Sequence, residues 1–214
     1  MDGTGTTRVI IVEDQELPAQ YVAMILAPRE DFTVVRIIKS AEMAYFYCAQ
    51  GNIDLVIMDI FTGLGSDGLA ASARIKAAFP QIKIVAVTSM PEVSYLKRAR
   101  EAGVDSFWYK EVAGEPLLDV LTRTVAGESI YPDSTPEVMI GKASSGVFTE
   151  RELDVLRELV RGVTNHEIAA KLFLSSTTVK DHISSMLAKT GLHSRTELAV
   201  RARELGLIIP ECDA

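Results

Sequence analysis

Two short apolar runs decide the fold: residues 55–59 read Leu-Val-Ile-Met-Asp, and residues 83–87 read Lys-Ile-Val-Ala-Val. Both are apolar at successive positions, as in central strands of a parallel sheet that helices cover on both faces. Further strand-like runs alternate with amphipathic stretches, so the sequence predicts a doubly wound α/β domain with a five-stranded parallel sheet. The expected strands are 8–12, 33–38, 53–58, 83–87 and 106–109, and the expected helices are 18–27, 41–50, 68–79, 93–102 and 116–126.

Residues 127–147 interrupt this alternation with glycine, proline, serine and threonine, a composition typical of an interdomain linker. From residue 148 onward the pattern is helical. One helix is expected to start near Ser175 or Ser176 and to end before Gly191. Other helix starts show the capping-box pattern of a hydroxyl residue followed three positions later by glutamate: Thr149 with Glu152, Thr164 with Glu167, and Ser194 with Glu197. We therefore expect an α/β domain over 1–126, a linker over 127–147 and an all-α, four-helix domain over 148–214.

Composition restricts the class of protein. An apolar fraction of 48% and a charged fraction of 24% are typical of a soluble globular chain, and 214 residues suit two ordinary domains. No apolar run approaches the roughly 18 residues that a membrane helix needs, and the N-terminus has no signal-peptide pattern. We therefore expect no membrane partner and a cytoplasmic location. Cys48 and Cys212 match no metal or redox spacing.

The charge distribution tells more than the net charge of −7. Residues 171–203 carry six basic and two acidic side chains, a balance of 6 − 2 = +4, which leaves −7 − 4 = −11 for the remainder. An acidic body with a local basic stretch fits a DNA-binding module joined to an acidic regulatory domain.

Polar residues follow four of the expected strands. Glu13 and Asp14 follow the first strand, Asp59 the third, Thr88 the fourth and Lys110 the fifth. In doubly wound sheets, ligands bind beyond the carboxyl ends of the strands. Converging carboxylates repel one another and attract a hard cation, and Mg²⁺ prefers oxygen ligands. Such a site could hold a phosphoryl group, with the lysine ammonium and the threonine hydroxyl as donors to its oxygens.

These residues resemble the receiver domain of two-component response regulators, and the resemblance covers roughly residues 8–126. It implies that Asp59 is the phosphoacceptor and that a histidine kinase is a partner. It also implies that Phe107, three residues before Lys110, is the switching aromatic. The implied Mg²⁺ ligands are Asp14 and Asp59 directly, Glu13 through water, and the backbone carbonyl of Phe61.

The loop after the acceptor departs from that family's pattern. Residues 59–68 read Asp-Ile-Phe-Thr-Gly-Leu-Gly-Ser-Asp-Gly, one residue longer than usual and without the common Met-Pro. We expect this glycine-rich loop to be more mobile, so an atypical receiver with phosphorylation-independent DNA binding stays an alternative. A haloacid-dehalogenase-like phosphatase is a third reading, but that family has a second Asp where this chain has Phe61. We therefore expect no enzyme.

The segment 149–202 resembles the helix-turn-helix domain of the LuxR and NarL/FixJ regulators. The matching residues are Thr149, Arg151, Glu152, Gly162, Asn165, Glu167, Ile168, Ala169, Leu172, Ser175, Thr178, Val179, Lys180, His182 and Lys189. Together with the receiver, this match indicates the NarL/FixJ subfamily. The resemblance implies promoter DNA as a partner and a homodimer that depends on phosphorylation.

Helical spacing over residues 176–189 separates a buried face from a polar face. The buried face is expected to hold Val179, Ile183, Met186 and Leu187. A polar face with short side chains and a cation suits the major groove, where Lys180 would contact a base or a phosphate. Asp181 would either accept from cytosine N4 or point to solvent. The expected DNA-binding set is Thr177, Lys180, Asp181, Ser184 and Lys189.

Overall fold

The computed structural model describes residues 5–62, 66–110 and 115–208. The chain divides into two compact units. Unit 1 comprises Met1–Ser89 and Ser94–Ser134, and unit 2 comprises Met90–Val93 and Thr135–Ala214. No helix in the described residues combines the length and the apolar character needed to cross a bilayer.

Unit 1 is built on a five-stranded parallel sheet with the strand order β2-β1-β3-β6-β7. The strands of the two runs quoted above, β3 and β6, lie next to each other, with Val56 beside Ile84. The order of the strands reverses between β1 and β3, which is where such sheets bind ligands. The expected doubly wound fold is confirmed. The strands are β1 (Thr7–Val12), β2 (Phe32–Ile38), β3 (Leu55–Asp59), β6 (Lys83–Thr88) and β7 (Ser106–Tyr109).

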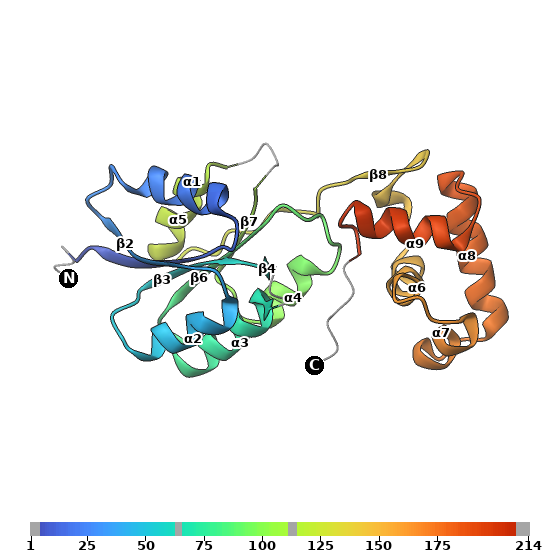
Figure 1. Cartoon of the computed structure of the whole chain (residues 1–214), viewed down its shortest axis with the longest axis horizontal. Coiled ribbons are helices and arrows are strands. Elements are labelled where there is room, and N and C mark those ends of the chain that lie inside the picture. The colour runs from blue at the N-terminus through green and yellow to red at the C-terminus, as the bar shows by residue number, and fades with distance from the viewer. Residues whose placement is uncertain (1–4, 63–65, 111–114, 209–214) are drawn as a thin grey trace. The chain divides into compact units, whose positions relative to one another are not determined.

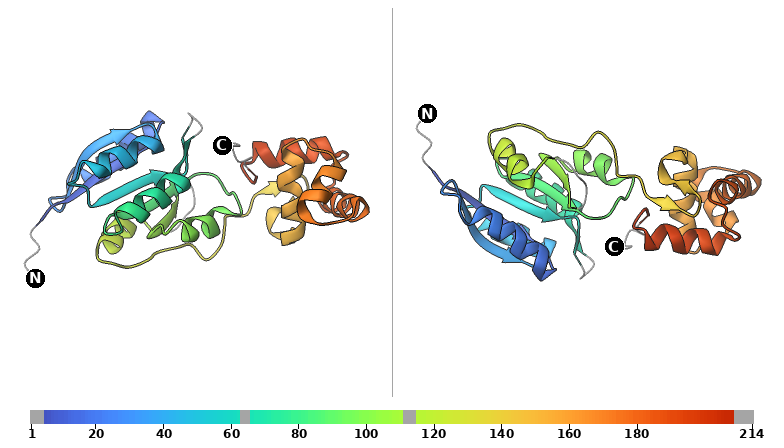
Figure 2. Two further views of the ribbon diagram at one scale, coloured as in Figure 1. Left: turned by 90° about the horizontal axis from the view of Figure 1, so that it is seen from below. Right: turned by 90° about the horizontal axis from the view of Figure 1, so that it is seen from above.

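Helices cover both faces of this sheet. Helices α1 and α5 lie on one face, and α2, α3 and α4 lie on the other (Figures 1 and 2). Ile11 and Ile57 of the sheet pack with Leu117 of α5 in a core from which water is excluded. Ile10, Val56 and Ile84, which point to the opposite face, are also buried, so both faces of the central strands are apolar. The helices are α1 (Glu16–Leu26), α2 (Ala41–Ala49), α3 (Gly68–Ala78), α4 (Tyr95–Glu101) and α5 (Leu117–Val125).

The long loop after Asp59 is paired on both sides of residues 63–65, which lie outside the described residues. Its flanks, β4 (Phe61–Thr62) and β5 (Ser66–Asp67), form a short antiparallel ladder. Asp67 then caps α3 by accepting from the backbone N–H groups of Leu69 and Ala70. The described flanks of the longer loop are therefore paired with each other.

Unit 2 is a small helical domain with its own core, which contains Val155, Leu156, Ile168, Met186 and Leu198. The capping boxes expected at the starts of α6 and α7 are present. At α9 the box is incomplete, because the Glu197 carboxylate accepts from the N–H of His193 instead of Ser194. The elements are β8 (Met139–Ile140), β9 (Ala143–Ser144), the 3-10 turn η1 (Ser145–Val147), α6 (Glu150–Val160), α7 (Asn165–Leu172), α8 (Ser176–Thr190) and α9 (Arg195–Glu204).

The boundary between the units, at Ser134 and Thr135, falls inside the range 127–147 that was expected to be a linker. The chain has hydrogen-bonded structure on both sides of that boundary. The backbone carbonyl of Ile130 accepts from the N–H of Phe107 in unit 1. The β8–β9 hairpin is joined to α8, because the N–H of Lys142 donates to the carbonyl of Thr190. Backbone groups near a folded surface need such partners whatever the local composition.

Candidate functional site

An acidic cluster lies where the strand order of unit 1 reverses. Asp59 ends β3, and Glu13 and Asp14 directly follow the neighbouring strand β1. Each of these carboxylates offers an oxygen within 4.8 Å of the other two. Glu13 and Asp59 are buried, with only 3% and 4% of their surface exposed. The parallel register thus brings together side chains that are 45 or more positions apart in the sequence.

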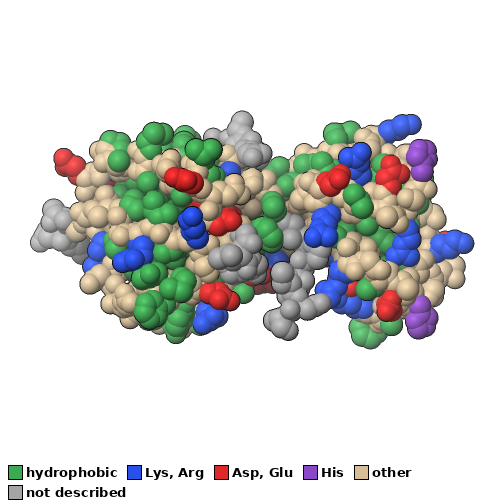
Figure 3. Space-filling model, in the orientation of Figure 1, with side chains coloured by type: hydrophobic (Ala, Val, Ile, Leu, Met, Phe, Trp, Pro, Cys, Tyr) green, Lys and Arg blue, Asp and Glu red, His purple; other side chains and the backbone are tan. Residues whose placement is uncertain are grey.

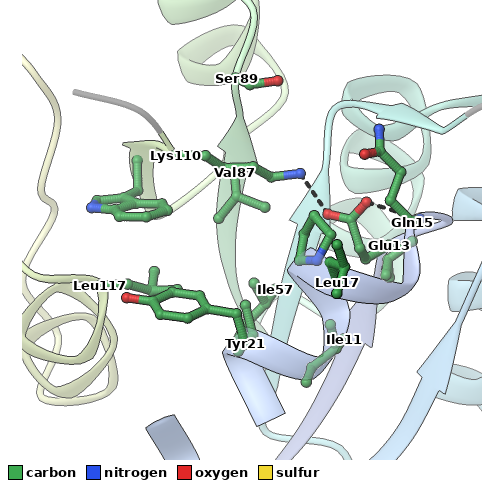
Figure 4. Close-up of a pocket in the computed structure, with 14 residues that line it drawn as sticks. Ile11, Glu13, Gln15, Leu17, Tyr21, Ile57, Val87, Ser89, Lys110 and Leu117 are labelled. Atoms are coloured by element: carbon green, nitrogen blue, oxygen red, sulfur yellow. Dashed lines mark hydrogen bonds and ion pairs between the residues drawn. The ribbon is translucent and has the colours of Figure 1, made fainter. Parts of the chain in front are cut away.

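Lys110 lies against this cluster from the end of β7. Its Nζ donates to Glu13 Oε2 at 2.5 Å and to Asp59 Oδ2 at 3.1 Å. Figure 4 shows the Lys110 and Glu13 side chains pointing toward each other above the strands. Burial and the nearby Glu13 charge raise the pKa of Asp59 to about 7, against the opposing effect of Lys110. Burial by itself would lower the pKa of Lys110, but the two carboxylates raise it above its usual value.

The remaining residues expected at this site lie directly after Asp59 or on the strands β6 and β7. The N–H of Phe61 donates to Asp59 Oδ1 at 3.4 Å, and the role expected of the Phe61 carbonyl stays a prediction. Thr88 is buried at the end of β6, beside the strand that carries Asp59. Phe107 is buried in β7, two residues before Tyr109, whose ring centroid lies 4.9 Å from that of Phe107.

The donor set fits Mg²⁺. Glu13, Asp14 and Asp59 offer only hard carboxylate oxygens, and three such groups within one crevice carry more negative charge than Lys110 alone balances. A bound divalent cation would neutralise that excess. The carboxylates of the described residues therefore have the chemistry and the spacing that the ion requires.

An apolar cavity of about 350 Å³ adjoins the cluster and shares Glu13 and Lys110 with it. Its floor is formed by residues of the sheet, among them Ile57 and Val87 (Figure 4). Trp108, the only tryptophan of the chain, also lines this cavity. Its fluorescence should therefore report changes at the acidic cluster.

In unit 2, helix α8 has the two faces that its sequence predicted. Val179, Ile183 and Met186 are buried in the core, and Leu187 packs against them. The opposite side is exposed to solvent, and on the face of unit 2 that Figure 3 shows, basic side chains are spread among fewer acidic ones. The exposed residues of α8 include Thr177, Lys180, Asp181, Ser184 and Ala188.

Lys189 has a partner inside unit 2. Its Nζ donates to both carboxylate oxygens of Glu152, at 2.6 and 2.9 Å, and to the carbonyl of Val147 at 3.0 Å. Glu152 is buried and also accepts from the Ser185 hydroxyl and from the N–H of Thr149. This pair ties α8 to the start of α6. The DNA contact expected of Lys189 stays a prediction.

Two features of unit 2 were not expected from the sequence. The Glu152–Lys189 pair joins residues 37 positions apart, and no local pattern signals it. Phe173, in the turn between α7 and α8, is 95% exposed and adopts a left-handed conformation with φ of 55°. A phenylalanine in a helical pattern is usually taken as a core residue, and only the positive φ and the exposure single it out.

Each of the two units matches a known protein family. Residues 9–122 match the model of the response regulator receiver domain, and residues 146–202 match that of the bacterial regulatory proteins of the LuxR family. The chain is 31% identical to the response regulator protein VraR of Staphylococcus aureus over 211 residues, which cover 95% of this chain and 99% of VraR. The VraR of Staphylococcus epidermidis is also 31% identical, over 94% of this chain and 98% of its own.

The chain is a response regulator. It consists of a receiver domain and a LuxR-type DNA-binding domain, as the resemblance implied. Solved structures support the fold of this response regulator. A structure of two RcsB dimers bound to two parallel DNAs matches with a TM-score of 0.63 at 20% identity, over 94% of this chain and 100% of that one. Salmonella RcsB bound to the promoter rprA with a beryllofluoride phosphomimetic matches with a TM-score of 0.60 at 22% identity, over 92% and 98%.

Proposed function

We propose that this response regulator is switched by phosphorylation of Asp59, and that the switch controls dimerisation and the binding of promoter DNA. The observation that carries the proposal is the cluster of Glu13, Asp14 and Asp59, with carboxylate oxygens within 4.8 Å and Lys110 bonded to two of them. A histidine kinase is the proposed phosphodonor, because the family pairs receivers with such kinases.

The geometry supports a direct transfer to Asp59. Its carboxylate oxygen would form a bond to phosphorus while the bond between phosphorus and the donor atom of the kinase histidine breaks. Mg²⁺ held by Glu13, Asp14 and Asp59 supplies charge neutralisation for the approaching phosphoryl group. Lys110 already lies at hydrogen-bond distance from Asp59, so its ammonium is placed to pair with a phosphoryl oxygen. Thr88, at the end of the adjacent strand, is the proposed hydroxyl donor.

The proposed promoter contacts lie on the exposed face of α8. Lys180 supplies the positive charge, and Thr177 and Ser184 supply short hydroxyl groups that fit the major groove. Asp181 is the proposed acceptor from a cytosine amino group. We leave Lys189 out of this set, because Glu152 and the Val147 carbonyl already bind its ammonium. RcsB, which shares this fold, has been solved with DNA.

Phosphoryl transfer tests the proposal. The full-length protein is incubated with radiolabelled acetyl phosphate and Mg²⁺, and the label is followed in the wild type and in Asp59→Asn. We expect label in the wild type, loss of label with a chelator, and no label in Asp59→Asn. Label that persists in Asp59→Asn would remove Asp59 from the proposed role.

A second candidate is an atypical receiver that leaves DNA binding independent of phosphorylation. The observation that favours it is the longer sequence after the acceptor, whose flanks β4 and β5 pair with each other close to Asp59. Trp108 fluorescence separates the two candidates. A receiver that accepts a phosphoryl group responds to Mg²⁺ with beryllofluoride, and an atypical one does not.

The proposed activity is regulation in the cytoplasm, without turnover of a substrate. Phosphatases of the haloacid-dehalogenase type carry a second aspartate two residues after the nucleophile. In this chain that position is Phe61, whose side chain offers no acid or base. Turnover of a phosphatase substrate by the purified protein would contradict this part of the proposal.

A further inference from the structure

Residues 129–131 lie along the outer edge of β7. The sheet ends at this strand, so its outer backbone groups have no neighbouring strand among those of the sheet. The N–H of Phe107 instead donates to the carbonyl of Ile130 at 2.8 Å, and the N–H of Ile130 donates to Ser106 Oγ at 3.0 Å. The Ser129 hydroxyl donates to the carbonyl of Asp105 at 2.8 Å. The segment is thus docked by backbone and side-chain bonds at successive residues.

The docked segment contacts the side chain of the proposed switching aromatic. The Tyr131 ring lies 6.1 Å from the Phe107 ring, measured between centroids. The guanidinium of Arg100, a residue of α4, lies over the Tyr131 ring, with its central carbon 3.9 Å from the ring centroid. The Tyr131 hydroxyl donates to the carbonyl of Val104 at 2.8 Å. Arg100, Tyr131 and Phe107 therefore form a stack that joins α4, the docked segment and β7; we call it the aromatic stack.

The aromatic stack includes a residue close to the end of unit 1. Tyr131 is three residues before Ser134, the last residue of unit 1, and unit 2 continues from Thr135. Any displacement of the Phe107 ring changes the contact that holds Tyr131, and any shift of the Phe107 backbone changes the bond to Ile130. The first residues of the connection to the DNA-binding unit thus depend directly on the aromatic.

We propose that Tyr131 and Arg100 are positioning residues of the switch, which make the docking of residues 129–131 on β7 depend on the position of Phe107. The inference rests on the proposed function, and it takes phosphorylation of Asp59 as the event that moves Phe107, the switching aromatic that the receiver resemblance implies. It adds to that function the physical route by which the state of the receiver reaches the connection to unit 2. The contacts of Tyr131 with Val104 and with Arg100 lie outside the acidic cluster.

Hydrogen exchange on the full-length protein tests this inference. The exchange rates of the Phe107 and Ile130 amides are measured in Mg²⁺ with and without beryllofluoride, and Trp108 fluorescence in the same samples reports whether beryllofluoride binds. We expect beryllofluoride to change both exchange rates in the wild type by about tenfold, the scale of one aromatic contact. If Trp108 responds and the two rates do not change, the inference is wrong and the proposed function stands. If Trp108 does not respond, the proposed function fails, and the inference fails with it.

Variants separate a coupling role from a merely structural one. Arg100 is exposed, so Arg100→Ala should fold and should reduce the beryllofluoride effect on the two amides by several-fold. Tyr131→Ala should do the same, and Tyr131→Phe should restore the wild-type response because it keeps the ring. The matched control is Arg74→Ala, which removes another exposed arginine from a tyrosine ring, that of Tyr45 at 5.0 Å. Wild-type responses in both Arg100→Ala and Tyr131→Ala, or an equal loss in Arg74→Ala, would overturn the inference.

Discussion

Nζ of Lys110 lies 3.1 Å from Oδ2 of Asp59, although 51 positions separate the two residues in the sequence. The parallel sheet brings them together, because β3 and β7 run in the same direction and their carboxyl ends lie at the same edge of the sheet. Lys110 balances part of the negative charge of Glu13 and Asp59 in a buried environment. That relationship makes the acidic cluster sensitive to the loss of Lys110.

Lys110→Ala should destabilise unit 1 without metal and make it depend on metal. The substitution leaves two buried carboxylates without their cation, and breaking a buried pair typically costs about 3 kcal/mol. Added Mg²⁺ should therefore raise the melting temperature of Lys110→Ala more than that of the wild type. The control is Lys83→Ala, since its partner Asp105 keeps a second lysine, Lys76. An equal effect of Mg²⁺ on the two proteins would argue against a metal site at this cluster.

Gly68→Ala should disturb the acceptor through its backbone. A Cβ at residue 68 would lie 2.2 Å from the carbonyl oxygen of Asp59 and 3.0 Å from Cα of Ile60, so the backbone must shift. Overpacking of this kind costs about 2 kcal/mol. We expect lower stability in urea denaturation and slower labelling by acetyl phosphate. Gly5→Ala, whose Cβ would meet nothing within 4 Å, is the control, and unchanged labelling in Gly68→Ala would contradict the expectation.

Unit 2 should lose stability in acid through Glu152. Burial favours the neutral acid, but bonds from Lys189, Thr149 and Ser185 outweigh it and lower the pKa of Glu152 to about 2. A carboxylate whose pKa is lower in the folded state contributes stability above its unfolded pKa of 4.5, and the contribution is lost as the pH falls toward 2. Denaturation of the wild type should show this loss when it is followed from about pH 6, above the unfolded pKa, down to about pH 2, near the folded pKa.

Lys189→Met should remove most of that pH dependence. It should also destabilise unit 2 near neutral pH by about 3 kcal/mol, because Glu152 stays buried without its cation. Arg201→Met, which breaks an exposed pair with Glu204, should change stability by only about 0.5 kcal/mol. A similarly small loss of stability in Lys189→Met would mean that the Lys189–Glu152 pair contributes little to the stability of unit 2.

Lys180→Ala should weaken the binding of DNA. If the ammonium contacts a phosphate, affinity falls evenly across sequences and the slope of log affinity against log salt decreases by about one. If it contacts a base edge, discrimination at one base pair falls by about 1–3 kcal/mol. Lys97→Ala, an exposed lysine of unit 1, serves as the control. Unchanged affinity and an unchanged slope in Lys180→Ala would exclude the exposed face of α8 as the contact surface.

The sequence was sufficient for the fold and for the acidic cluster because both follow from local patterns. Apolar runs such as 55–59 fix the strands, and the parallel arrangement then places Glu13, Asp14 and Asp59 at one edge. The two faces of α8 likewise follow from helical spacing. In each case the local pattern sets the strand or helix, and the regular geometry of the sheet or helix then sets which residues share an edge or a face.

Pairings between distant residues could not be predicted in this way. The ion pair of Lys189 was not predicted because its partner, Glu152, belongs to another helix. Residues 129–131 looked like linker because their partners, such as Phe107, lie on a strand more than 20 positions earlier. Glycine, proline and serine indicate that a segment is not a helix, but they do not tell whether a free strand edge will bind it.

The most direct test of the account is the affinity for DNA with and without beryllofluoride. Footprinting first selects promoter fragments from the organism's own genome. The affinities of the full-length wild type and of Asp59→Asn for these fragments are then compared in Mg²⁺. We predict that beryllofluoride tightens binding by the wild type, with paired half-sites protected, and leaves Asp59→Asn unchanged. Equal affinity of the wild type in both conditions, on fragments that it binds specifically, would contradict control by Asp59.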